Sequence, residues 1–276
     1  DFEEIPDNIL STGVQTKWKR GYRGKGGVVA VLDSGCQTNH PDLQERIIGG
    51  YNFTAENNGD ITIYEDYNGH GTHVAGVIGG SVNKVGIVGI SPKVDLLILK
   101  VLNKRGAGST DSLVEAINYA IDWRGINNEK VRVISLSLGI KRDVPKLHEA
   151  IKRAISNNVS VVASSGNDGD GNASTAEYRF PGSYPEAIVV GAANYEKNVA
   201  HFSNTNEYVD LYAPGVGIYS AYMDGEYKIL AGTSMATAHV SGAIALLIEE
   251  YEHLLSRKLN EDEVFKLLMK HTTVVD

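Results

Sequence analysis

The feature that most constrains the fold is a repeated alternation of short apolar runs with longer amphipathic stretches. The five runs are rich in Val and Ile and cover residues 28–32, 94–101, 131–138, 159–164 and 187–192. They lack strict polar alternation, which is typical of strands covered on both faces of a parallel sheet. Helical patterns cover about 70–80, 111–123, 145–157, 234–250 and 261–271. This strand–helix–strand repetition predicts an α/β layered domain with right-handed crossovers.

Local signals at helix starts and loops add detail to this prediction. Thr110 and Asp111 can cap the second helix. Asn260 can cap the last helix, and Glu263 three residues on can complete a capping box. The segment 166–175, rich in Gly, Asn and Asp, is typical of a surface loop.

Composition and charge restrict the class of protein. The 276 residues are 42% hydrophobic and 22% charged, and no repeat or linker divides them, so we expect one domain over residues 1–276. Because the chain begins with Asp instead of Met, residues 1–12 are a candidate trimmed N-terminal segment. The net charge of −8 disfavours nucleic acid as a partner, and the absence of a run of ~20 apolar residues disfavours a membrane. The single cysteine, Cys36, allows no intramolecular disulfide and fits a reducing compartment.

Three short segments, each rich in glycine and small residues, carry an acid, a base and a nucleophile. Asp33 lies in VVAVLDSGC (28–36), His70 in DYNGHGTHVAG (66–76) and Ser234 in GTSMATAHVSG (232–242). A serine hydroxyl is a poor nucleophile at neutral pH. It needs an imidazole to accept its proton and a carboxylate to orient that imidazole. The three segments together indicate triad hydrolysis far more specifically than any one of them alone.

Each segment also has an ordinary structural interpretation. Asp33 at the end of an apolar run is typical of a turn or cap, and Ser234 before a helical pattern is typical of an N-cap. His70 and His73 together raise the alternative of a metal site. The sequence HGTH, however, lacks the i, i+4 spacing and the glutamate of the zinc-protease motif HExxH. We therefore expect His73 to be a buried, hydrogen-bonded structural residue.

At separations of 37 and 164 residues, the three segments resemble the subtilisin family of serine proteases. The resemblance extends from about residue 21 to 247, and IIGGYNFT (47–54), Cys36 and KLNEDEVFKLL (258–268) are similar to intracellular subtilisins of Bacillus type. It implies a three-layer subtilisin-like fold, with helices on both faces of a mostly parallel sheet. It also implies a processed serine endopeptidase of broad specificity, which acts on polypeptides in the cytoplasm, binds Ca²⁺ and is a candidate homodimer.

The same resemblance implies roles for individual residues. Asp33, His70 and Ser234 would form the catalytic triad. Asn167, in VVASSGNDG, would stabilise the oxyanion together with the backbone N–H of Ser234. An extended peptide would lie as an added strand between two edges, Ser137, Leu138 and Gly139 beside the main specificity pocket and Gly106, Ala107 and Gly108 opposite. The glycines of these edges are equally typical of a loose loop.

Two cation sites also follow from the resemblance. Segment 79–89 is similar to the family's high-affinity calcium loop. Its ligands would be the carboxylate of Asp42, the side-chain oxygen of Asn83 and the carbonyls of Ser81, Val85 and Ile87, an all-oxygen set that suits Ca²⁺. Glu3 aligns near a further ligand. A second, weaker site would use the carbonyls of Gly182, Tyr184 and Ala187, with Asp210 nearby.

Two positions depart from the family pattern. Ala238 stands four residues after Ser234, where the family usually has proline, and it restores a backbone N–H beneath the nucleophile. Ile140 follows Ser-Leu-Gly where glycine is common, which predicts a narrower rim of the specificity pocket. Ala238 is the one hint of an alternative function, a peptide ligase or transacylase. The other alternative is a non-catalytic protease-like binding protein, and the intact triad and oxyanion asparagine argue against it.

Overall fold

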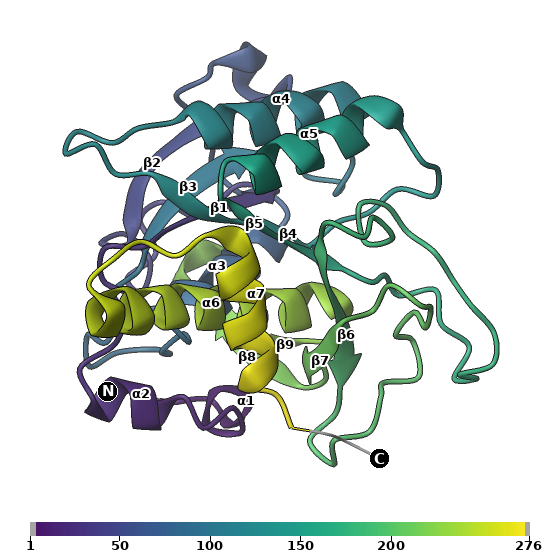
Figure 1. Ribbon diagram of the computed structural model, residues 1–276. Coiled ribbons are helices and arrows are strands. Elements are labelled where there is room, and N and C mark those ends of the chain that lie inside the picture. The colour runs from purple at the N-terminus through teal and green to yellow at the C-terminus, as the bar shows by residue number, and fades with distance from the viewer. Residues whose placement is uncertain (1–3, 274–276) are drawn as a thin grey trace.

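The computed structural model describes residues 4–273 and contains a central sheet of seven parallel strands, which crosses the middle of the molecule (Figure 1). The strands are β1 (Val28–Asp33), β2 (Ile47–Asn52), β3 (Asp95–Lys100), β4 (Val131–Leu136), β5 (Ser160–Ser164), β6 (Ile188–Ala193) and β7 (Leu211–Pro214). Their order across the sheet is β2-β3-β1-β4-β5-β6-β7, and each neighbouring pair is parallel. The five predicted strands are therefore confirmed, and β2 and β7 extend the sheet at its two edges.

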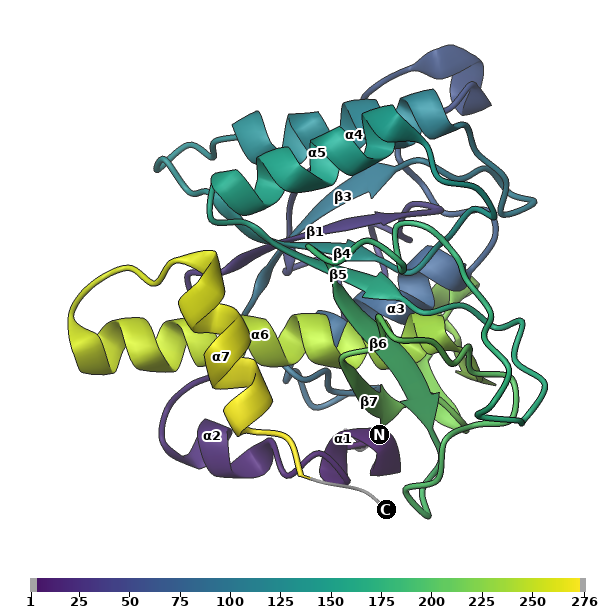
Figure 2. The ribbon, with the colours of Figure 1, turned by 45° about the vertical axis from the view of Figure 1, so that its right-hand side comes forward.

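Helices cover both faces of the sheet, which confirms the three-layer α/β fold (Figure 2). One face packs against α4 (Thr110–Asp122) and α5 (Pro145–Ser156). The other packs against α3 (His70–Gly79), α6 (Thr233–Leu255) and α7 (Glu261–Lys270). Alternate residues of β1 pack against opposite helix layers. Val28 lies in the core shared with α4 and α5, and Val29 lies in the core shared with α3 and α6. This explains why the strand is apolar throughout.

The remaining elements surround the layer that contains α6. The short helices α1 (Asp7–Leu10) and α2 (Gln15–Lys19) contribute Ile9 and Trp18 to a third, smaller core that includes Leu246 of α6. Strands β8 (Ile218–Ala221) and β9 (Tyr227–Leu230) form an antiparallel pair that contacts α3. Two 3-10 helices, η1 (Glu56–Gly59) and η2 (Met223–Gly225), lie in connecting loops. No helix within residues 4–273 is both long and apolar enough to cross a membrane.

The structure confirms the cap predicted for α7 and contradicts the caps predicted for α4. Asn260 and Glu263 form the predicted capping box of α7, with N–H to side-chain oxygen distances of 2.9 and 3.1 Å. The predicted caps of α4 are wrong, because Ser109 Oγ accepts the hydrogen bond from Ser112 N at 3.0 Å. Thr110 and Asp111 are instead the first two residues of the helix. The negative charge of Asp111 there still interacts favourably with the positive end of the helix dipole.

Candidate active site

Asp33 and His70 meet at the carboxyl edge of the sheet. Asp33 is the last residue of β1 and is 1% exposed, and His70 is the first residue of α3. Asp33 Oδ1 lies 2.7 Å from His70 Nδ1 and also accepts a hydrogen bond from Ser34 N at 2.7 Å. A carboxylate on Nδ1 orients the ring and leaves Nε2 available as a base.

Glycines allow the start of α3 to approach the end of β1 this closely. Gly69, the N-cap residue, has a φ of 102°, in the left-handed region where glycine carries no steric cost. A Cβ at Gly71 would lie 2.1 Å from the carbonyl oxygen of Gly35, so a larger residue would push the helix away. The motif around His70 is thus rich in glycine for a local steric reason.

Two opposing effects act on the pKa of His70. Burial lowers it, because a charged ring loses its hydration, while the charge of Asp33 and the hydrogen bond to it raise it, with a further contribution from the charge of Asp66. The net result is a raised pKa. The site therefore favours a ring that can accept a proton at near-neutral pH.

Ser234 is the second residue of α6 and is 8% exposed. Its hydroxyl donates to the carbonyl oxygen of Ser137 at 3.1 Å, and the Ser137 hydroxyl donates to the carbonyl oxygen of Ser234 at 2.8 Å. No hydrogen bond joins Ser234 to His70 among residues 4–273, so the predicted contact between nucleophile and base is not formed in this conformation. Such contacts often tighten only when substrate binds, and this one requires the Ser234 hydroxyl to turn away from Ser137.

Hydrogen bonds from Thr233 to the side-chain oxygen of Asn167 fix the orientation of its amide group. Asn167 Oδ1 accepts hydrogen bonds from Thr233 N at 2.9 Å and from Thr233 Oγ1 at 2.8 Å. Its amide nitrogen makes no hydrogen bond within residues 4–273 and lies near Gly232, at the start of α6. Asn167 is exposed, so its side-chain N–H groups are open to a ligand near the start of α6, and donors of this kind can bind an oxyanion.

Two buried charged residues that the sequence motifs did not predict, Asp66 and Lys100, lie next to this pair. Asp66 accepts five hydrogen bonds from the segments that flank Asp33 and His70. Lys100 pairs with Asp33 in the β1–β3 register and is fully buried. Its Nζ donates to the carbonyls of Ser34 and Glu65 and forms an ion pair with Glu56 at 2.7 Å. A lysine inside an apolar run was the available signal for Lys100.

Comparison with known proteins identifies the family. The model of the Subtilase family matches residues 24–275. The chain belongs to the subtilase family. It is 48% identical to "Intracellular serine protease" of Paenibacillus polymyxa, over 98% of this chain and 80% of that protein. It is 45% identical to "Major intracellular serine protease" of Bacillus subtilis, over 100% and 85%, and 40% identical to "Subtilisin Savinase" of Lederbergia lenta, over 89% and 84%. The protein is thus a subtilisin-like serine endopeptidase, as the three motifs predict.

The two predicted substrate edges of this subtilase lie at the same end of the sheet as Asp33. Ser137 contacts Ser234 directly, and Leu138 and Gly139 continue from it toward the surface. The loop with Gly106, Ala107 and Gly108 follows β3 and is exposed. It is connected to the His70 segment, because Asn68 Nδ2 donates to the carbonyl of Lys104 at 2.9 Å. A Cβ at Gly108 would lie 2.2 Å from the carbonyl oxygen of Val101, which explains this glycine sterically.

His73, the second histidine of the motif, has a structural environment, as predicted. It is fully buried, and its Nε2 lies 3.0 Å from the carbonyl oxygens of both Ile218 and Lys228. Burial lowers its pKa to about 4, so the ring is neutral at pH 7.

The predicted calcium loop of this subtilase folds around Asp42, which is fully buried. Asp42 Oδ1 accepts from Asn83 Nδ2 at 2.9 Å, and Oδ2 accepts from Ile87 N at 3.0 Å and Tyr227 OH at 2.8 Å. The Ser81 hydroxyl is buried without a hydrogen-bond partner among the described residues. A buried carboxylate that faces only neutral donors fits a cation ligand, but the Asn83 amide here turns its nitrogen toward Asp42. Glu3 lies outside the described residues.

The residues of the second predicted cation site lie around the start of β6. The carbonyl of Tyr184 accepts from Ala187 N at 3.1 Å, and Gly182 is two residues before Tyr184. Asp210 Oδ2 accepts from Val189 N at 2.9 Å, and burial raises the pKa of Asp210. One of the three carbonyls is therefore already engaged in a hydrogen bond.

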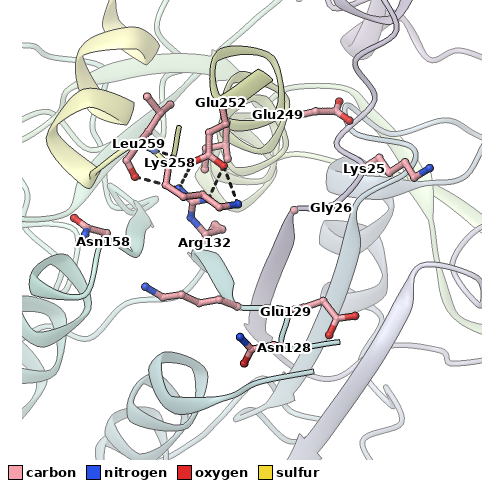
Figure 3. A pocket seen from close by; sticks show the side chains of 13 residues that line it. Lys25, Gly26, Asn128, Glu129, Arg132, Asn158, Glu249, Glu252, Lys258 and Leu259 are labelled. Atoms are coloured by element: carbon pink, nitrogen blue, oxygen red, sulfur yellow. Dashed lines mark hydrogen bonds and ion pairs between the residues drawn. The ribbon is translucent and has the colours of Figure 1, made fainter. Parts of the chain in front are cut away.

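A separate hollow of about 470 Å³ lies at the amino ends of the central strands, opposite the strand ends that carry Asp33 (Figure 3). Its lining includes Gly27 and Lys130, which directly precede β1 and β4. Its central charges pair with one another, since Arg132 binds Glu252 through two hydrogen bonds of 2.9 and 2.8 Å. This hollow contains none of the residues predicted for catalysis.

Proposed function

We propose that Ser234 is the nucleophile of this endopeptidase, His70 its general base and Asp33 the residue that orients His70. The observation that carries the proposal is the 2.7 Å contact between Asp33 Oδ1 and His70 Nδ1, at the edge of the sheet where α6 begins. His70 Nε2 would accept the Ser234 proton as the hydroxyl attacks the peptide carbonyl. It would then protonate the leaving amine, and water would repeat the sequence on the acyl-enzyme.

Asn167 completes this proposal as the oxyanion donor. Its side-chain oxygen is held by Thr233, so rotation of the amide would break two hydrogen bonds. The side-chain N–H groups are therefore preorganised, and together with the backbone N–H of Ser234 they would bind the developing negative charge.

The polypeptide substrate would lie extended between the two edges. Ser137, Leu138 and Gly139 would pair with one side of its backbone, and Gly106, Ala107 and Gly108 with the other. Ile140, which exchanges hydrogen bonds with Phe180 at 2.8 Å in both directions, would narrow the rim of the specificity pocket.

Calcium would bind at the loop that directly follows α3. Asp42 would supply its carboxylate, Ser81, Val85 and Ile87 their carbonyls, and Asn83 its oxygen after a turn of its amide. The buried carboxylate of Asp42 supports this assignment, because a cation would neutralise it. The backbone bond from Glu4 N to Gly86 O, at 2.8 Å, would connect the N-terminal segment to the occupied loop. A weaker cation site would use the carbonyls of Gly182, Tyr184 and Ala187.

We also propose that this single-domain protease acts inside the cell, as the names of its Paenibacillus and Bacillus relatives indicate for those proteins. A homodimer is proposed on the resemblance to the intracellular subgroup. The edge strand β7, beside an open groove of about 740 Å³, supports it, because an edge strand offers unpaired backbone groups to a second copy. Sedimentation velocity at two protein concentrations tests this assembly.

A labelled fluorophosphonate probe tests the catalytic assignment. Ser234→Ala should abolish labelling and lower kcat by roughly 10⁶, a magnitude that was measured in subtilisin itself. Ser241→Ala is the matched control, because Ser241 lies in the same helix but hydrogen-bonds to Ser135 Oγ at 2.7 Å. Labelling that persists in Ser234→Ala would refute the assignment.

A further inference from the structure

We propose that Asp66 is a positioning residue of the active site, which ties the loop after Asp33 to the helix start that carries His70. The inference rests on the roles proposed above for Asp33 and His70. Within the described part of the chain, the hydrogen-bond partners of Asp66 are Ser34, Asn68, Gly69 and Thr72, so it would act through Asp33 and His70.

The hydrogen bonds of Asp66 saturate its carboxylate. Oδ1 accepts from Ser34 Oγ, Asn68 N and Gly69 N, each at 2.9 Å. Oδ2 accepts from Thr72 N at 3.0 Å and from Thr72 Oγ1 at 2.6 Å. A carboxylate has about four lone-pair sites, so five donors leave none of its acceptor capacity unused.

These contacts hold the backbone on both sides of His70. Asn68 and Gly69 precede it and Thr72 follows it, so one carboxylate binds the turn and the first residues of α3 together. Ser34 completes the connection to Asp33. Its N–H donates to Asp33 Oδ1 at 2.7 Å, and its hydroxyl accepts from Gly71 N at 2.9 Å while it donates to Asp66. Movement of either segment would break several of these bonds at once.

Among residues 4–273, the buried carboxylate of Asp66 has no cationic partner. Asp66 is 4% exposed, its five donors are neutral, and Lys100 pairs with Glu56 instead. The five hydrogen bonds offset part of the cost of burying this charge, and an amide, with one acceptor oxygen, could not accept all of them. The negative charge near His70 also stabilises the imidazolium that forms during catalysis, and it contributes to the raised pKa of His70.

The other titratable groups around this network do not duplicate that charge. Glu65 binds Thr38 N and Oγ1 at about 3.0 Å, and the pKa of the Cys36 thiol is raised by burial and by the charges of Asp66 and Glu65, so the thiol stays neutral. His73 is neutral, as described above. The titratable groups around Asp66 and His70 come from several packed elements. They are Asp33 on β1, Lys100 on β3, His73 on α3, Glu56 on η1, Tyr222 just before η2, Lys228 on β9, and Cys36, Tyr64 and Glu65 in the flanking loops.

The test compares Asp66→Asn with Glu65→Gln, which removes the same charge from the adjacent residue but not from the network. In Asp66→Asn, kcat on a peptide nitroanilide should fall by about 10- to 100-fold with KM nearly unchanged, since small misplacements of reacting groups have effects of that size. The acid limb of kcat/KM should also move to lower pH, because loss of the negative charge lowers the pKa of His70. Glu65→Gln should change neither quantity. Equal kcat and equal pH profiles in the two variants would overturn the proposal.

A second variant separates geometry from charge and covers the case in which Asp66→Asn does not fold. Ser34→Ala removes the hydroxyl that connects position 34 to Asp66 and Gly71, while it keeps both carboxylates and the backbone N–H that donates to Asp33. It should lower kcat but leave the acid limb of the pH profile in place, and an unchanged kcat would overturn the positioning role.

Fluorophosphonate titration gives the folded, active fraction of each variant. If Ser234→Ala keeps its activity, the proposed function itself fails; if Ser234→Ala is inactive and Asp66→Asn behaves like Glu65→Gln, only the present inference fails.

Discussion

The stability of this protease should fall as the pH drops from about 6.5 to 4, because two histidines are buried as neutral rings. His73 Nε2 lies 3.0 Å from two carbonyl oxygens, and His239 Nδ1 lies 2.7 Å from the carbonyl oxygen of Met235. Burial lowers the pKa of each to about 4. The unfolded chain, with a histidine pKa of about 6.5, binds protons first as the pH falls. Protonation therefore favours unfolding in this range, and the stabilisation is complete only above about pH 6.5.

The size of the stability loss follows from how far burial lowers the pKa of the two histidines. A pKa depression of about 2.5 units corresponds to about 3 kcal/mol of lost stability for each histidine below pH 4. At pH 5 the loss is about 2 kcal/mol for each. For a chain of this length, about 2 kcal/mol corresponds to a fall of roughly 4–8 °C in Tm.

Calorimetry of a His73→Gln variant tests this reasoning. Glutamine can still donate to a carbonyl but cannot be protonated, so the fall in Tm between pH 7.5 and pH 5 should be about 4–8 °C smaller than in the parent. Both proteins would carry Ser234→Ala, which prevents self-digestion during the scan. An identical pH dependence with and without His73 would refute the argument that its burial as a neutral ring limits stability in acid.

Three further predictions concern the site and its supports. Asn167→Leu should lower kcat by ~10²–10³, a magnitude known from subtilisin itself, with KM nearly unchanged; a change mainly in KM would make Asn167 a binding residue. Removal of calcium by a strong chelator should lower Tm and speed self-digestion, since a metal at 100-fold excess over its Kd adds about 2.7 kcal/mol to the native state. An unchanged melting curve after confirmed metal removal would exclude that role. Ala238→Pro should change both kcat and the ratio of aminolysis to hydrolysis on one ester substrate, because position 238 lies one helical turn beyond Ser234. Identical values in both forms would show that the departure from the family pattern is silent.

Some elements of the fold could be predicted from local pattern, and others could not. The strands covered on both faces were visible as apolar runs, because burial on two sides leaves no polar alternation. β2 and β7 were missed, since β2 is only half-buried for most of its length and β7 has only four residues. The cap of α4 was misplaced because Ser109, Thr110, Asp111 and Ser112 are all capping residue types, and only the backbone conformation selects Ser109.

The sequence by itself determined the chemical inventory of the site. Aspartate, histidine and serine, each in a glycine-rich segment, identify a triad hydrolase, because few other functions need those residue types in such settings. Asn167 and the calcium loop followed from the family resemblance.

Tertiary structure alone decided how those groups interact. Asp33 and His70 are 37 residues apart in the sequence. They meet only because β1 ends, and α3 begins, at the same edge of the sheet. The fold also turns the Ser234 hydroxyl toward Ser137, buries Lys100 against Glu56, and surrounds Asp66 with five donors. Protonation and charge in a protein interior depend on desolvation and on partners that are distant in the chain, which no local pattern of residues encodes.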